Sequence, residues 1–354
     1  MKTRELFNAV MHYEDYDRMP VFHWTGWGET IERWRGEGMP EDISEHDFFG
    51  ASPLCCWIPV NLDLFPLFEE EVIEETKSWV VKRQNDGVIA KLFKGRSSIP
   101  TYMDFLLKDP SGWPEYEKRL QPDPARLPDD LDATLAQLNE SDAPVAMPAM
   151  SMVGFLRNWM GVENMAVASM IFPDFFAHTV DVISDLVCWA IDQVAPKVKI
   201  DFGWSWEDIC FRTGPLIQPD AFAKLCVPGY RKISDKLRSY GCDLYAVDCD
   251  GLIDHLVPHW LDGGVNVMFP VEIGAWNADP MALRKRYGKE LRIFGGVDKL
   301  ALERGPAAID AEITRRMPLM AAGGFVPLPD HLITPDTPLQ NVRYYLERIR
   351  GLRF

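Results

Sequence analysis

The stretch YAVDCDG, residues 245–251, is a short apolar run that ends in Asp248 and Asp250, one on each side of a cysteine. In an extended strand, side chains two positions apart point to the same face. Two carboxylates held that close repel each other unless a cation, a substrate or water surrounds them. The stretch is therefore either a ligand site at a strand end or a polar loop, and its place in the fold decides between the two.

Similar apolar runs recur along the chain and alternate with amphipathic stretches typical of helices. The runs are MPVFHW (19–24), CCWIPVNLDLF (55–65), APVAMPAM (143–150), VKIDFGW (198–204), DLYAVDC (243–249), VNVMFP (265–270), LRIFGG (291–296) and GFVPL (324–328). The clearest helical stretches are 177–195, 219–240, 306–321 and 337–350, the last with Thr337 as N-cap and Pro338 in the first turn. Eight near-continuous apolar strands, each followed by a helix, predict an α/β protein with a (β/α)8 TIM barrel.

One insertion interrupts this alternation. The segment SWVVKRQNDGVIAKLFK (78–94) alternates apolar and polar residues on both sides of Asn85-Asp86-Gly87. An Asp-Gly pair in that setting is typical of a tight hairpin turn, so we expect a β-hairpin here. No repeat or change in composition divides the remainder, and residues 1–354 are predicted to form a single domain.

Charge and composition restrict the kind of partner. The 354 residues carry a net charge of −16, which argues against nucleic acid, because such partners require a basic surface. No window offers the roughly 18 consecutive apolar residues of a membrane span. The start of the chain lacks a secretory signal, and the seven cysteines include no CxxC pair. We expect a cytoplasmic protein that acts on a small molecule.

The active sites of such barrels lie at the C-terminal ends of the strands, which turns the predicted topology into a set of candidate residues. In strand order these are His23 and Trp24; Asp63; Arg157; Trp206, Glu207, Asp208 and Arg212; Asp248 and Asp250; Glu272; Lys299; and Asp330 and His331. A ring so rich in acidic groups destabilises the fold unless cations or shared protons relieve the repulsion.

Several of these residues have a structural alternative. Glu207 or Asp250 could cap a helix, and His331 could simply hydrogen-bond Asp330. Arg212 could hold a substrate carboxylate or pair with Asp208. Similarly, Lys299 could face the barrel mouth or pair with Asp298. Tryptophans near the strand ends would form walls suited to a flat or apolar ligand: Trp24, Trp27, Trp204, Trp206 and Trp276.

Motifs across most of the chain resemble the uroporphyrinogen decarboxylase superfamily. The resemblance is carried by HWTGWGETIERWRGEGMP, GPLIQPDAF, PGYRKI, DCDG, PVE, FGGVDK and GGFVPLPDHLITPDTPLQN. It implies a (β/α)8 barrel and two activities, tetrapyrrole decarboxylation and cobamide-dependent methyl transfer with a zinc ion that activates a thiol. It also implies a homodimer.

The chain departs from both branches of the family. The arginine-rich RQAGRY-like segment of the decarboxylases is missing after the first strand, and their tyrosine after the third strand aligns with Phe155. The methyltransferases carry His-x-Cys after the fifth strand and a cysteine after the eighth. Here these positions hold Asp248, Asp250 and His331, which can still bind zinc or another divalent ion.

Three functions follow. The first is metal-assisted methyl transfer between a small substrate and a corrinoid carrier supplied by a partner protein, with Asp248, Asp250 and His331 as ligands and Glu207 or Asp208 positioning the acceptor or relaying a proton. The second is cofactor-free decarboxylation of uroporphyrinogen or another carboxylic acid, using Asp63. The third is a barrel that binds a ligand without turnover.

Overall fold

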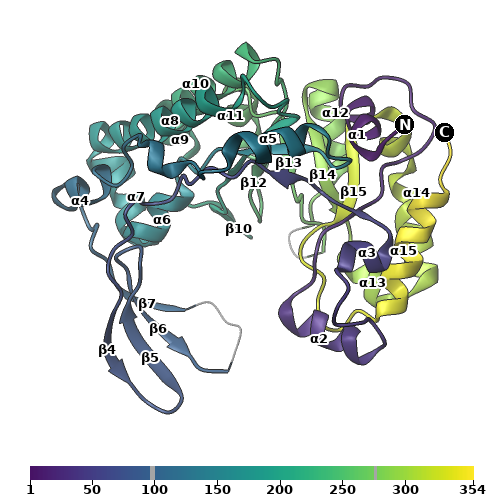
Figure 1. The fold of residues 1–354 in the computed structure, drawn as a ribbon, viewed down its shortest axis with the longest axis horizontal. Coiled ribbons are helices and arrows are strands. Elements are labelled where there is room, and N and C mark those ends of the chain that lie inside the picture. The colour runs from purple at the N-terminus through teal and green to yellow at the C-terminus, as the bar shows by residue number, and fades with distance from the viewer. Residues whose placement is uncertain (96–99, 275–276) are drawn as a thin grey trace.

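A curved parallel β-sheet forms the centre of the computed structural model, which describes residues 1–95, 100–274 and 277–354 (Figure 1). Its strands are β3 (Cys56–Trp57), β8 (Val145–Pro148), β9 (Phe202–Trp206), β12 (Tyr245–Asp248), β13 (Val267–Phe269), β14 (Arg292–Val297) and β15 (Phe325–Pro329). They hydrogen-bond in the order β15-β14-β13-β12-β9-β8-β3, and each neighbouring pair is parallel. Each predicted apolar run from the second to the eighth therefore contributes a strand.

The first strand position belongs to a separate pair of short strands. Strand β1 (Phe22–His23) runs parallel to β2 (Ser52–Pro53), and the chain continues from β2 directly into β3. A parallel bridge between Gly26 and Ile333 joins the segments that follow β1 and β15. All eight predicted strand positions are thus present, although the continuous ladder contains seven. The second strand region also ends at residue 57, earlier than predicted, so Asp63 lies in the loop beyond it.

The interior of the barrel is filled by side chains from every strand position. The inward-facing buried residues are Phe22, Leu54, Ala146, Phe202, Ala246, Val267, Phe269, Phe294, Val326 and Leu328. Helix α1 (Thr3–Met11) closes the N-terminal end, where the ring of Phe7 contacts Phe22, Phe202 and Phe294 with centroids 5.6–6.0 Å apart. With this end sealed, only the C-terminal ends of the strands can open to a ligand.

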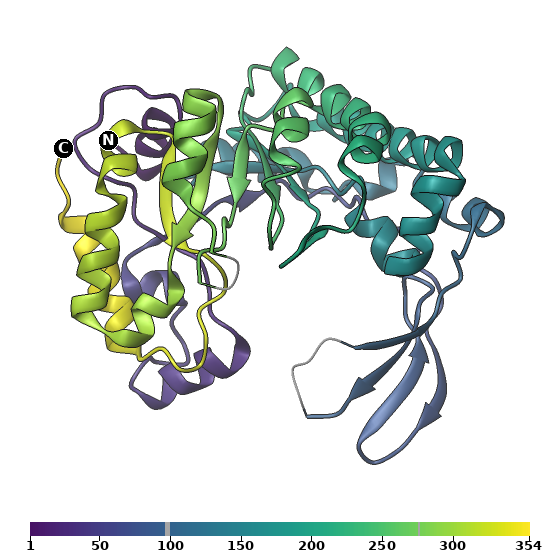
Figure 2. The same ribbon diagram turned by 180° about the vertical axis from the view of Figure 1, so that it is seen from behind.

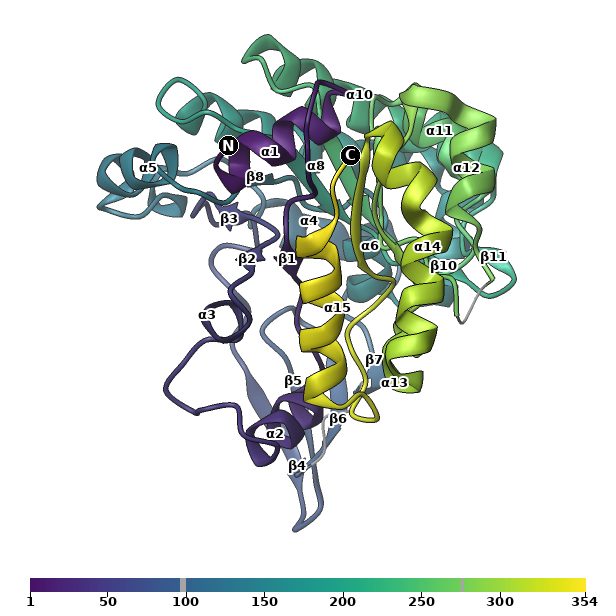
Figure 3. The ribbon, with the colours of Figure 1, turned by 90° about the vertical axis from the view of Figure 1, so that its right-hand side faces the viewer.

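Helices cover the outer face of the sheet, as Figures 1 and 3 show. The longer ones are α8 (Pro173–Val194), α10 (Val227–Ser239), α14 (Pro306–Ala322) and α15 (Leu339–Gly351). The predicted helix 219–240 is divided into α9 (Pro219–Leu225) and α10, because Pro228 has no N–H to donate to the carbonyl of Lys224. The others are α2 (Gly28–Gly36), α3 (Glu45–Phe49), α4 (Trp113–Glu117), α5 (Leu131–Asn139), α6 (Gly154–Met160), α7 (Val162–Ile171), α11 (Val257–Asp262), α12 (Pro280–Tyr287) and α13 (Lys299–Arg304), with 3-10 turns η1 (Pro110–Gly112), η2 (Pro124–Arg126) and η3 (Gly288–Glu290).

The predicted hairpin is part of a larger antiparallel sheet. Strands β5 (Trp79–Arg83) and β6 (Ile89–Phe93) form it, and β4 (Glu71–Glu75) and β7 (Thr101–Asp104) extend it on both sides. Figures 1 and 2 show this four-stranded arm projecting from the body of the protein. The predicted insertion is therefore confirmed and is twice as wide as the sequence indicated.

Within the described residues, no single helix has both the length and the apolar character needed to cross a membrane. The pair α7 and α8 meets the criterion only when joined, and the two helices are bent by 110° relative to each other.

Candidate active site

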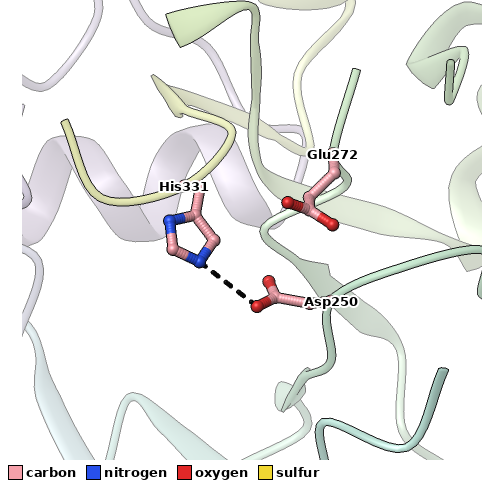
Figure 4. Close-up of side chains that lie close together, drawn as sticks. All are labelled: Asp250, Glu272 and His331. Carbon is pink, nitrogen blue, oxygen red and sulfur yellow. Dashed lines mark ion pairs between the residues drawn. The ribbon is translucent and has the colours of Figure 1, made fainter. Parts of the chain in front are cut away.

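Three ionisable side chains converge at the C-terminal mouth of the barrel. Asp250, Glu272 and His331 follow β12, β13 and β15, and one ligand atom from each lies within 4.8 Å of the other two (Figure 4). The His331 Nε2 atom is 3.3 Å from Asp250 Oδ2. Two carboxylates and an imidazole are a donor set that suits zinc and other divalent cations.

The surroundings of this triad hold its side chains in place. Glu272 is buried and its Oε2 accepts a hydrogen bond from Gly251 N at 2.9 Å. The His331 ring stacks on Trp27, with centroids 5.8 Å apart and planes 22° apart. Fixed ligand orientation is a common property of metal sites.

Electrostatics within the triad favour the presence of a cation. Burial, together with the nearby Asp250 carboxylate, raises the pKa of Glu272 to about 7. Burial by itself would lower the pKa of His331, but the hydrogen bond and charge of Asp250 outweigh it, and the pKa is raised. Glu272 and His331 therefore hold their protons more tightly than usual, and a bound divalent cation would displace those protons.

Asp248, predicted as a metal ligand, does not belong to the triad, and Glu272 takes its place. The side chain of Asp248 points to the same face of β12 as that of Ala246, which lies inside the barrel. Asp248 therefore also faces the mouth. Burial and the charges of Asp250 and Asp208 raise its pKa well above the usual range. The Asp248 carboxyl therefore holds its proton more tightly than an exposed aspartic acid does.

Backbone strain gathers at the same end of the barrel. Met150, Asp208 and Val271 follow β8, β9 and β13 and have φ angles of 53°, 46° and 55°. Positive φ is unfavourable for residues with a side chain, above all for β-branched valine. Such strain is typical of segments that position functional groups.

Glu207 has a structural role that differs from the predicted catalytic one. Its carboxylate is completely buried and accepts hydrogen bonds from the backbone N–H groups of Met152, Val153 and Gly154, at 2.6–3.0 Å. The hydroxyl of Ser151, and that of Tyr230 on α10, also donate to it. Burial raises its pKa despite these donors. Glu207 therefore caps the start of α6 and cannot reach a substrate, as the capping alternative predicted.

Asp330, predicted to bind substrate, is also fully occupied by the backbone. Its buried carboxylate accepts hydrogen bonds from the N–H groups of Ile273 and Gly274 at 2.6 and 3.0 Å, and from Lys299 N at 2.9 Å. It ties together the loops that follow β13, β14 and β15. Asp330 thus positions the loop that carries Glu272 and is not available to a substrate.

His23, the other buried candidate, faces away from the mouth. Its Nε2 lies 2.7 Å from Glu45 Oε2, and its ring packs against Phe49 on α3. Burial lowers its pKa. The neighbouring Trp24 does lie at the mouth, where its ring is 4.6 Å from that of Phe269 and 6.1 Å from that of His331.

The cationic candidates are placed differently from one another. Arg157 pairs with Asp208 at 3.0 Å, and its guanidinium lies 5.2 Å from the ring centre of Trp206. Arg212 is exposed at the turn between β10 (Cys210–Phe211) and β11 (Gly214–Pro215), and Asp208 pairs with Arg157 in place of the alternative pair with Arg212. Lys299 is half-buried, and its charge acts on both Glu272 and His331, whereas the neighbouring Asp298 pairs with Arg304.

An aromatic cavity of about 360 Å³ opens near the C-terminal ends of β3, β8 and β9. It is lined by Trp57, Val60, Leu62, Asp63, Pro148, Met150, Phe155, Trp204 and Trp206. Ring contacts connect it to the triad: Trp204 lies 4.9 Å from Phe269, which in turn contacts Trp24 beside His331. Asp63 and Trp206 line the same cavity, whereas Trp276 lies outside the described residues.

Comparison with known proteins agrees with this architecture. Residues 175–352 match the family model described as Uroporphyrinogen decarboxylase (URO-D). The chain belongs to the uroporphyrinogen decarboxylase family.

Relatives in this family are distant in sequence. The uroporphyrinogen decarboxylase of Picosynechococcus is 22% identical over 217 residues, which cover 60% of this chain and 57% of that protein. That of Sphingopyxis alaskensis is 30% identical over 116 residues, 33% of this chain and 27% of the relative. The matches therefore span less than two thirds of each relative.

A methyltransferase from Methanosarcina mazei has a similar structure, with a TM-score of 0.63 and 17% identity; the match covers 99% of this chain and 98% of that one. At this identity the likeness concerns the fold alone. The URO-D fold therefore extends over the whole chain.

The geometry also locates the departures from the URO-D family pattern. Phe155, which the resemblance aligns with the family tyrosine, lines the aromatic cavity with a ring that carries no hydroxyl. Arg33 in the segment after β1 pairs with Glu37 and donates to the carbonyl of Pro335, so it does not point into the mouth. Trp57 is not among the candidates that the sequence indicates, whereas Glu272 is a catalytic candidate there, placed by its position directly after the sixth apolar run, and is not among the predicted metal ligands.

Proposed function

We propose that this chain is a URO-D family enzyme that transfers a methyl group to or from a small substrate, with a divalent metal ion bound by Asp250, Glu272 and His331. The observation that carries the proposal is the convergence of these three donors within 4.8 Å of one another. A methyltransferase that shares the fold over the whole chain supports methyl transfer as the reaction.

The donor set fits a metal ion. Two carboxylates and one imidazole favour zinc or a harder divalent cation, and the raised pKa values of Glu272 and His331 reflect a site that lacks compensating positive charge. A metal bound there would act as a Lewis acid and lower the pKa of a coordinated acceptor or substrate group. The protein itself contributes fixed orientation, through Trp27 against His331 and through Asp330 on the Glu272 loop.

The reaction moves a methyl group between two nucleophilic atoms. The bond from the methyl carbon to the donor atom breaks, its electron pair stays on the donor, and an electron pair of the acceptor forms the new bond. The carrier would be a reduced corrinoid supplied by a separate protein, as the resemblance implies. Asp248, whose pKa is raised by burial and by the charges of Asp250 and Asp208, would hydrogen-bond a substrate at the mouth.

Metal titration tests the proposal. Protein stripped with a chelator is titrated with Zn²⁺ in a calorimeter, and we expect the wild type to bind one equivalent. The double variant Asp250→Asn, Glu272→Gln should bind none at the same concentrations. Asp208→Asn is the matched control, because it removes one charge at the same mouth outside the triad. Equal binding by wild type and double variant contradicts the metal site.

Decarboxylation is the second candidate, because the curated relatives described above carry the name uroporphyrinogen decarboxylase. Asp63 does line the cavity, as this reaction requires. A polycarboxylate substrate, however, requires cationic partners, and Arg157 is already paired while Arg33 points elsewhere. Incubation with uroporphyrinogen, followed by mass spectrometry for loss of carbon dioxide, tests this reaction directly, and we expect no loss.

A further inference from the structure

The aromatic cavity has an unusual wall. Four of its nine lining residues are aromatic: Trp57, Phe155, Trp204 and Trp206. Among the described lining residues one carries a charge, the carboxylate of the exposed Asp63, and none is basic. Its volume of about 360 Å³ is within the range of small-molecule sites.

The lining rings contact one another in two pairs. Trp57 and Trp204 meet at 86° with centroids 5.8 Å apart, and Phe155 and Trp206 lie at 41° with centroids 6.0 Å apart. The face of an aromatic ring carries partial negative charge, which attracts a cation placed over it. The guanidinium of Arg157 lies 5.2 Å from the ring centre of Trp206, so this ring already makes a cation–π contact within the protein.

The chemistry of this wall distinguishes between ligands. A cation with N–H groups would lose hydrogen bonds to water and find few acceptors on a wall of rings, Met150, Pro148 and aliphatic side chains. An anion would meet Asp63 with no basic partner. A cation covered by methyl groups gains both apolar burial and attraction to the rings, and aromatic cages recognise such groups.

We propose that this cavity binds a quaternary ammonium or a similar methylated onium group, and that this group is the methyl donor of the reaction. The inference rests on the proposed methyl transfer. The C–N bond breaks with its electron pair left on nitrogen, and an electron pair of the reduced corrinoid carrier forms the new bond to carbon, so no proton is required. The product is a neutral tertiary amine, which the rings attract less strongly and release.

An isosteric pair of probes tests the preference for charge. Choline and 3,3-dimethylbutan-1-ol have the same shape, and only choline is a cation. By calorimetry we expect wild-type protein to bind choline about tenfold more tightly than the neutral alcohol. Trp206→Leu and Asp63→Asn should each weaken choline binding severalfold and leave the neutral alcohol less affected, and Trp206→Phe should restore part of the affinity. Trp79→Leu on the arm is the control and should have no effect.

Each outcome separates the two proposals. Equal affinity for choline and the alcohol, or choline binding that none of the cavity variants alters while circular dichroism shows them folded, overturns the onium site. Choline binding without methyl transfer to reduced cobalamin, followed by the absorbance of the corrinoid, supports the cavity assignment and counts against the proposed reaction. Transfer from O-methyl donors without any preference for choline supports the reaction and overturns the onium inference.

Discussion

At the scale of single residues, the mouth of the barrel separates carboxylates into two kinds. Glu207 and Asp330 are buried and saturated by backbone N–H donors, so they are structural. Asp250 and Glu272 face each other and His331, and part of their hydrogen-bonding capacity remains free for a ligand. The two kinds of carboxylate differ in their hydrogen-bond partners, which the residue type alone does not reveal.

Stability of the metal-free protein should depend on Glu272. Its pKa is about 7 in the folded state and roughly 4.3 in an unfolded chain, so stability falls as the pH rises between these values, because the folded state resists loss of the proton. We expect Glu272→Gln to raise the melting temperature at about pH 8 and to change it little at about pH 5. Glu290→Gln, on the exposed surface, is the control. A variant that melts with the wild type at both pH values contradicts the assignment.

Glu207 should be essential for folding. Glu207→Ala leaves three backbone N–H groups and two hydroxyls without their acceptor in a dry interior, which should lower the free energy of unfolding by about 3–5 kcal/mol. Tyr230→Phe removes one of these donors and should cost about 2 kcal/mol. Urea unfolding measures both. A loss below about 1 kcal/mol for Glu207→Ala would be inconsistent with this role.

At the scale of elements, the site is built from loops that the strands bring together. One triad residue follows each of the strands β12, β13 and β15, and Asp330 connects the loops after β13 and β14. The parallel register places these ends side by side. The buried carboxylate of Asp330 consequently holds the loops after β13 and β14 together.

Asp330→Asn should loosen these loops. The amide keeps one acceptor oxygen but places an NH₂ group against a backbone N–H, so we expect hydrogen exchange at Ile273, Gly274 and Lys299 to accelerate about tenfold. Asp298→Asn is the control, because this residue caps α13 through Leu300 N and should affect that amide instead. Unchanged exchange at Ile273 and Gly274 would contradict the role of Asp330.

At the scale of the whole molecule, one surface is unusually apolar. Helix α7 exposes Val167, Met170 and Ile171 by 53%, 68% and 64%. Exposed apolar surface of this kind is typical of association sites. It is a candidate for the homodimer interface that the resemblance predicts.

Light scattering after size exclusion tests the dimer. We expect a mass close to twice the 40.4 kDa of one chain. The double variant Met170→Asp, Ile171→Asp should elute as a monomer, because each charge would be buried without a partner. Ile43→Asp, at another exposed apolar position, is the control. A monomeric wild type, or a double variant that stays dimeric, rules out this interface.

The sequence alone determined the barrel, the hairpin insertion and the strand ends that the candidate residues follow. These follow from periodicity: apolar runs at all eight strand positions and the turn at Asn85-Asp86-Gly87 are local signals that the final packing preserves. The break at Cys226 between α9 and α10 was missed, although Pro228 is a local signal for it.

Only the tertiary structure decided which candidates form a site. Glu207, His23 and Asp330 have the residue types of catalytic groups, yet their side chains are buried against partners distant in sequence. Glu272 replaced Asp248 in the triad because the ends of β12, β13 and β15 converge in space. A linear sequence shows which strand end a residue follows, whereas hydrogen-bond partners and facing directions depend on contacts between segments far apart in the chain.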